Sequence, residues 1–312
     1  MRSSHSTARR SSTTWPASGR GRALPTAEPF GAGSSVVLFG LASAIAWGAG
    51  DFGGGLASRR GPVLGVALVV QALGSILAGG LAILAAEGVP GPGAIVTAAA
   101  AGVAVVVGIL CLYQGLAVGR MGVVAPVTAV IAATMPVVFG MIVAGLPSPP
   151  VMAGIGLALV AVVLVSRVPG IDGARSGIEF GLVGGVGIGS FNILIGQLPH
   201  GQVFGPLFIV KLAATLVIVG LVIGGRRSVR LPRAVLPLAL AAGVFDMAGN
   251  AMYVLATQAG RLDVAATLSS LYPVTTILLA IVLLGERVTR SHAAGIAAAV
   301  VGIALIGAGG GA

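Results

Sequence analysis

Three ionisable residues lie inside long apolar stretches of the chain, namely Asp51, Lys211 and Asp246. A charged side chain at the centre of a bilayer costs about 2.5–3.5 kcal/mol, so such groups face a cavity, pair with one another or change protonation. An acid in a cavity can take up a proton when the cavity is empty and release the proton when substrate arrives. Such an acid couples the movement of protons to the movement of substrate. We therefore predict that these three residues couple substrate to protons.

The depths of the three charges predict which of them pair. With helices counted alternately from one face, Lys211 lies about 10 Å deep, Asp246 about 15–18 Å and Asp51 about 22 Å. The lysine stem reaches about 6 Å, so Asp246 is the better partner and Asp51 is left to titrate. Simpler interpretations remain open: Lys211 reaches the interface along its stem, Asp246 forms only an ion pair, and Asp51 bonds a neighbouring helix.

Uncharged polar and aromatic residues accompany the charges. Four of them are predicted to line the cavity: Trp47, Gln71, Asn192 and Asn250. Each amide could equally bond another helix, and the tryptophan could equally be a core aromatic. Tyr113 and Tyr253 lie near the ends of their apolar runs, where an interfacial aromatic belt is the expected role.

Composition indicates what positions these residues. Of 312 residues, 56% are hydrophobic and 8% are charged, whereas an ordinary soluble domain is about 25% charged. Residues 1–35 form a polar tail that we expect to be disordered. Ten apolar runs follow, without the alternation of a β-barrel, and most are long enough to cross a bilayer as helices. Their ranges are 36–57, 62–86, 94–117, 123–144, 150–166, 178–198, 204–224, 236–258, 264–284 and 291–307.

The chain repeats itself at a period of about 140 residues. Phe39-Gly40-Leu41 recurs as Phe180-Gly181-Leu182, and Asp51 falls on Asn192, both at an offset of 141. Five spans per repeat, an odd number, would insert the two halves with opposite orientation, as in secondary transporters. We predict an all-α integral membrane protein of ten transmembrane helices, as two inverted five-helix repeats at 36–168 and 177–308.

Small residues and prolines are predicted to shape the helix contacts. Small residues spaced by four put a ridge on the first helix of each half, which forms either a moving seam or static packing. They are Gly40, Ala44 and Gly48 in the first half and Gly181, Gly185 and Gly189 in the second. Prolines are expected to interrupt the fourth and ninth spans and permit hinges there. They are Pro126, Pro136 and Pro273.

Three sequence motifs resemble those of a known family. They are Trp47-Gly48 with Asp51, the segment 119–128 (GRMGVVAPVT), and Leu284-Gly285-Glu286-Arg287 followed by Ala294-Gly295-Ile296. The chain resembles the drug/metabolite transporter superfamily, specifically its ten-helix proteins with two EamA domains, over about residues 36–307. The corresponding segment of the first half is Gly145-Leu146-Pro147-Ser148, which has no acid at the position of Glu286. This difference argues against a functional role for Glu286 that both halves share.

The resemblance implies a multi-pass carrier in the cell membrane for small metabolites or drugs, often an exporter, that works by alternating access. A lipid-carrier flippase and a channel-like permease are the alternatives on the same scaffold. The net charge of +10 comes without aromatic residues interleaved along a basic stripe, so nucleic-acid binding is not expected. One cysteine and three scattered histidines predict no metal site, and no nucleophile cluster predicts an enzyme. We expect no cofactor; the partners are a small-molecule substrate and lipid, as a monomer or a homodimer.

Overall fold

The computed structural model describes residues 32–118, 121–165, 177–225, 228–284 and 290–309. These ranges hold eleven α-helices and, within them, no strand. The helices are α1 (Ala32–Ser58), α2 (Val63–Leu84), α3 (Pro92–Val118), α4 (Met121–Ala144), α5 (Pro149–Val165), α6 (Ile178–Ile195), α7 (Phe204–Gly225), α8 (Leu236–Ala259), α9 (Leu262–Ser269), α10 (Tyr272–Leu284) and α11 (Arg290–Gly309). Residues 1–31 of the predicted tail lie outside the described residues.

Length and apolar composition fit most of these elements to a bilayer. Within the described residues, seven stretches are long and apolar enough to cross a membrane, and the pair α9–α10 counts as one of them. Three further apolar helices are shorter: Pro149–Leu164, Glu179–Ile195 and Ala293–Ile306. Large apolar side chains are exposed on the outside of the bundle, for example Ile83 (81%) and Leu84 (82%). Such a surface needs apolar surroundings, which a lipid bilayer provides.

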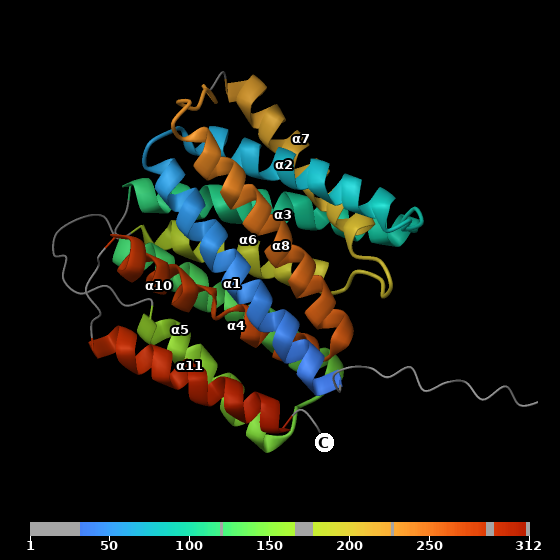
Figure 1. The fold of residues 1–312 in the computed structure, drawn as a ribbon, viewed down its shortest axis with the longest axis vertical. Coiled ribbons are helices and arrows are strands. Elements are labelled where there is room, and N and C mark those ends of the chain that lie inside the picture. Colours follow the sequence, from blue (N-terminus) through green and yellow to red (C-terminus); the bar gives the residue numbers. More distant parts are fainter. Residues whose placement is uncertain (1–31, 119–120, 166–176, 226–227, 285–289, 310–312) are drawn as a thin grey trace, which may run out of the picture.

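Most helices pack mainly against helices of the other half of the chain (Figure 1). Helix α1 packs mainly against α8 and also contacts α9 and α10, while α6 packs against α3 and α4. Helix α2 packs against α7 and α8, and α7 in turn against α2 and α3. Helices α5 and α11 form a separate pair, visible along the lower edge of Figure 1. The main contacts therefore correspond between the halves: α1 with α8 matches α6 with α3, and α2 with α8 matches α7 with α3.

The glycine ridge of α1 lies against the broken ninth span. A Cβ added at Gly40 would lie 2.8 Å from the Cβ of Leu268, and one at Gly48 would lie 2.5 Å from the Cβ of Thr275. Neither distance is compatible with a side chain, so glycine permits these close contacts.

The ridge of α6 makes the equivalent contacts with α4. A Cβ at Gly185 would lie 2.7 Å from the Cβ of Ile131, and one at Gly189 would lie 2.9 Å from the sulfur of Met135. The hydroxyl of Thr128 donates a hydrogen bond to the carbonyl of Gly181 over 3.2 Å. Both ridges therefore join the first helix of one half to the fourth span of the other half.

The prolines act differently in the two halves. The ninth span is interrupted: α9 ends at Ser269 and α10 begins at Tyr272, so Pro273 is in the first turn of α10, where a missing N–H costs nothing. Helix α4, by contrast, continues through Pro126 and Pro136 as one helix, so these prolines do not end it, and a hinge at either of them stays a prediction. Each proline removes one donor, and the bonds on either side, with the packing against α6, hold α4 together.

Candidate functional site

Lys211 and Asp246 form the ion pair that their depths predicted. The Lys211 Nζ atom lies 2.5 Å from the Asp246 Oδ2 atom, across the contact region of α7 and α8 with α2. The lysine side chain is fully buried and the aspartate side chain is 21% exposed. A Cβ at Gly74 of α2 would lie 3.1 Å from the lysine Cδ, so α2 packs directly on the lysine stem. Burial of Lys211 is possible because its charge is paired within the bundle.

Asp51 has no such partner. Among the described residues it forms no ion pair and accepts no hydrogen bond, although the charge of Asp246 and the phenol of Tyr272 are near enough to interact with it. The Asp51 side chain is exposed, although many protein atoms lie around it. Asp51 is therefore a carboxylate held inside the bundle without a compensating cation from the described chain.

Helical geometry shows which way Asp51 faces. Ile45 is 60% exposed and marks the outer face of α1. Asp51 comes six residues later, which at 100° per residue is about 120° around the helix from that face. Trp47 lies one turn before Asp51 on nearly the same side, and its ring packs on α8 at Gly249. Asp51 consequently lies on a different side of α1 from Ile45, with Asp246 of α8 and Tyr272 of α10 near enough to interact with it.

Trp47 begins a chain of contacts that joins three helices. Its Nε1 donates a hydrogen bond to the Asn250 Oδ1 atom over 3.1 Å, and its ring lies 5.3 Å from that of Tyr253 between centroids. The Tyr253 hydroxyl donates to the backbone carbonyl of Asn192 over 3.1 Å. Helices α1, α8 and α6, which belong to both halves, thus meet at one polar cluster.

Tyr253 is not at the interface, which corrects the prediction of an aromatic belt. The side chain is fully buried within the bundle. It lies three residues from Asn250 and so shares its helix face, a spacing that could have placed it in the site. The side chain of Tyr113, its counterpart in the repeat, lies outside the described residues.

Several buried amide atoms in this region have no hydrogen-bond partner. They are the Asn250 Nδ2, the Asn192 Oδ1 and the Gln71 Oε1 atoms. Asn250 is fully buried and Asn192 is 7% exposed, while Gln71 belongs to α2 on the lysine side of the site. An unpaired buried polar group costs about 1–3 kcal/mol, so these atoms are sites for an additional hydrogen-bonding group.

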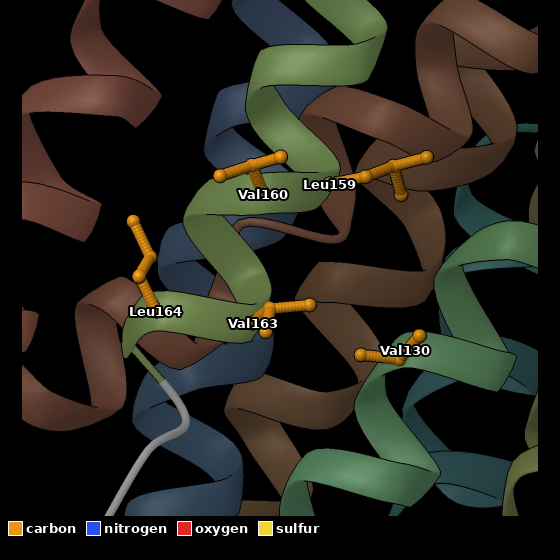
Figure 2. Close-up of a pocket in the computed structure, with 5 residues that line it drawn as sticks. All are labelled: Val130, Leu159, Val160, Val163 and Leu164. Atoms are coloured by element: carbon orange, nitrogen blue, oxygen red, sulfur yellow. The ribbon is translucent and has the colours of Figure 1, made fainter.

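An open hollow elsewhere on the molecule is unsuited to polar chemistry (Figure 2). It is lined by five aliphatic side chains, four from α5 and one from α4: Val130, Leu159, Val160, Val163 and Leu164. Acyl chains match such a surface better than a polar solute does. In the described part of the chain, no group of three His, Cys, Asp or Glu residues is placed to hold a metal ion.

Two comparisons with known proteins gave matches. Residues 175–308 match the model of the EamA-like transporter family. A crystal structure of another protein is similar with a TM-score of 0.70, over 87% of this chain and 96% of that one, at 18% sequence identity. At that identity the likeness concerns the fold alone. Among curated protein sequences, none matches the chain.

The family match covers the second of the two predicted repeats, and it agrees with the resemblance that the motifs indicated. The apolar helices independently indicate several membrane crossings. Residues 175–308 are therefore identified as an EamA-like transporter domain, within a multi-pass membrane protein.

Proposed function

We propose that the whole chain is a secondary active carrier of a small metabolite or drug-like solute in the cell membrane. All ten apolar spans cross the bilayer, and residues 36–168 and 177–308 form two inverted repeats. The exchange of packing partners between the halves supports this, since α1 meets α8 as α6 meets α3. Substrate binds between the halves, and rocking of one half against the other gives alternating access. The family resemblance favours export.

The observation that carries the proposal is the unpaired carboxylate of Asp51. Lys211 and Asp246 neutralise each other, so the cluster keeps one uncompensated negative charge. Either a proton or a cationic substrate can neutralise it, and the two exclude one another at a single carboxylate. Release of one on arrival of the other would couple the fluxes across the membrane.

The amide atoms without partners support a second contact with substrate. Asn250 offers a donor and Asn192 an acceptor, and both lie close to Tyr253. Asp246 and Asn250 are one turn apart on α8, about 6 Å along the helix axis. A solute with a positive end and a hydrogen-bonding end would match both groups, with Trp47 as a flat apolar neighbour.

The test is transport in proteoliposomes. A set of labelled amines and metabolites is screened for uptake with and without a pH gradient, and the native chain should concentrate one class of solute only with the gradient. Asp51→Asn should abolish the effect of pH while the protein remains folded. The matched control is Glu179→Gln, which neutralises an exposed acid in the first turn of α6. Unchanged pH-dependent transport by Asp51→Asn would rule out this role.

The alternatives are separated by the same preparation. A flippase for lipid carriers needs a free cation for a phosphate, but Lys211 is buried and paired with Asp246, which disfavours it. A channel would equilibrate labelled solute without counterflow, whereas a carrier exchanges external label for internal unlabelled solute.

A further inference from the structure

We propose that Glu87 and Arg261 form a latch that holds one face of the carrier closed and opens during each transport cycle. The inference rests on the proposed carrier function. Both residues lie outside the candidate site, and both connect the first half of the chain to the second half at the ends of helices.

Glu87 binds the beginning of α7. Its Oε1 atom accepts hydrogen bonds from the backbone N–H groups of Val203 (3.0 Å) and Phe204 (3.1 Å), and its Oε2 atom accepts one from Gly205 (2.7 Å). The first N–H groups of a helix have no partner within the helix, and the helix dipole favours an anion there. A carboxylate from the α2–α3 loop therefore caps a helix of the other half.

Neighbouring contacts strengthen this connection. The Gln202 side chain donates to the carbonyl of Gly88 over 2.7 Å. The Gln258 side chain, near the end of α8, donates to the carbonyl of Gln202 over 2.9 Å and accepts from the N–H of Gly201 over 3.3 Å. The α2–α3 loop, the α6–α7 loop and the end of α8 are thus joined by one set of hydrogen bonds.

Arg261 makes the reverse connection, from the second half to the first. Its guanidinium group donates to the carbonyls of Ala144 and Gly145 at the end of α4. It also forms an ion pair with Asp263 over 2.8 Å, and the Asp263 side chain is fully buried. A cation at a helix C-terminus is favoured by the dipole, so Arg261 binds the end of α4 while Asp263 fixes its orientation.

These contacts lie at a single face of the bundle. The ends of α2, α4 and α8 meet the beginnings of α7 and α9 there, and the α2–α3 turn is at the right of Figure 1. Asp51 lies seven residues before the end of α1, about 10 Å from the opposite face. Closure at the Glu87 face therefore agrees with an exposed Asp51 that is nearer to the other face.

The sequence repeat lacks both carboxylates at the opposite face. At offsets of 140 and 141, Glu87 falls on Arg227 and Ser228, and Asp263 falls on Gly122 at 141. Arg261 alone has a counterpart of its own kind, Arg120, which is outside the described residues. The repeat counterparts of Glu87 and Asp263 therefore cannot form the same carboxylate contacts at the opposite face.

The latch can be tested by cysteine labelling of the full chain in proteoliposomes, without knowledge of the substrate. In a Cys111→Ser background, Thr257→Cys places a thiol at a buried position just below the latch, on α8. The latch is broken by Glu87→Gln or by Arg261→Gln, and the matched control is Glu179→Gln. A charged membrane-impermeant thiol reagent should label Thr257→Cys about tenfold faster when either latch variant is present than when the latch is intact. The control variant should not change the labelling rate.

A second reporter separates opening of the latch from unfolding. This reporter is Ala57→Cys. Ala57 is fully buried near the opposite face, in the apolar cluster of α1, α2 and α8. Faster labelling at Thr257→Cys alone supports the latch. Equal acceleration at both reporters, or none at either, overturns it. The assay does not depend on transport, so loss of the Asp51 role and loss of the latch give different results.

Discussion

The Tyr253 hydroxyl on α8 donates a hydrogen bond to the backbone carbonyl of Asn192 on α6, over 3.1 Å. Asn192 is the counterpart of Asp51 in the sequence repeat. The bond therefore links α6 to the same polar cluster that Trp47 of α1 joins from the first half of the chain. The asparagine Oδ1 atom itself stays unpaired. The backbone carbonyl of Asn192 therefore holds the helices together, while its side-chain oxygen stays available for the proposed contact with substrate.

Asn192→Leu should accordingly separate the two roles. The Tyr253 bond uses the backbone carbonyl and survives, and loss of an unpaired buried oxygen relieves a cost of about 1–3 kcal/mol. We expect the unfolding midpoint in detergent to be unchanged or raised, while the KM for the transported solute rises about tenfold. An unchanged KM at full stability would remove Asn192 from the binding site.

Lys211→Met should strongly destabilise the protein. It leaves the Asp246 carboxylate without its cation, and breaking a buried ion pair from one side costs about 3–5 kcal/mol. Addition of Asp246→Leu should recover most of that loss, because neither charge of the pair then remains. Chemical denaturation of the two variants in detergent measures the difference. A double variant as unstable as the single one would show that the pair acts through packing alone.

Gly48→Ala should disturb the contact of α1 with α10. The added Cβ would lie 2.5 Å from the Thr275 Cβ and 2.6 Å from the carbonyl oxygen of Tyr272, so the helices must move apart. Overpacking of this kind costs about 1–3 kcal/mol. Gly55→Ala is the control on the same helix, since nothing lies within 4 Å of its Cβ. Thermal unfolding should shift for the first variant and not for the second.

Ala86→Gly should stabilise the protein. Ala86 has a φ of 50°, the left-handed conformation that glycine adopts at lower cost, at the turn that brings Glu87 toward α7. The expected gain is about 1 kcal/mol. Ala85→Gly, at a φ of −79°, should instead lose stability. A loss at position 86 as well would mean that the alanine methyl group makes a contact worth more than the backbone strain.

The sequence identified the parts of this protein that depend on regular geometry. The rise of an α-helix is fixed, so counting residues was sufficient to predict the pairing of Lys211 with Asp246. The same counting misplaced Tyr253, because distance from a helix end does not say which neighbour covers that end. The hydrogen bonds of Glu87 and Arg261 were missed since they depend on how loops pack against helix ends of the other half. A proline pattern did not distinguish α4, which stays whole, from α9 and α10, which do not.

That last difference has a mechanical consequence. Helix α4 is continuous where it packs against the glycines of α6. The glycine ridge of α1, by contrast, packs against two short helices, α9 and α10, which are joined by Ser270 and Leu271. A break between two helices bends more easily than a continuous helix does, so, under the proposed carrier function, we expect more bending at the α9–α10 break than within α4. The two halves would then move by unequal amounts in one transport cycle.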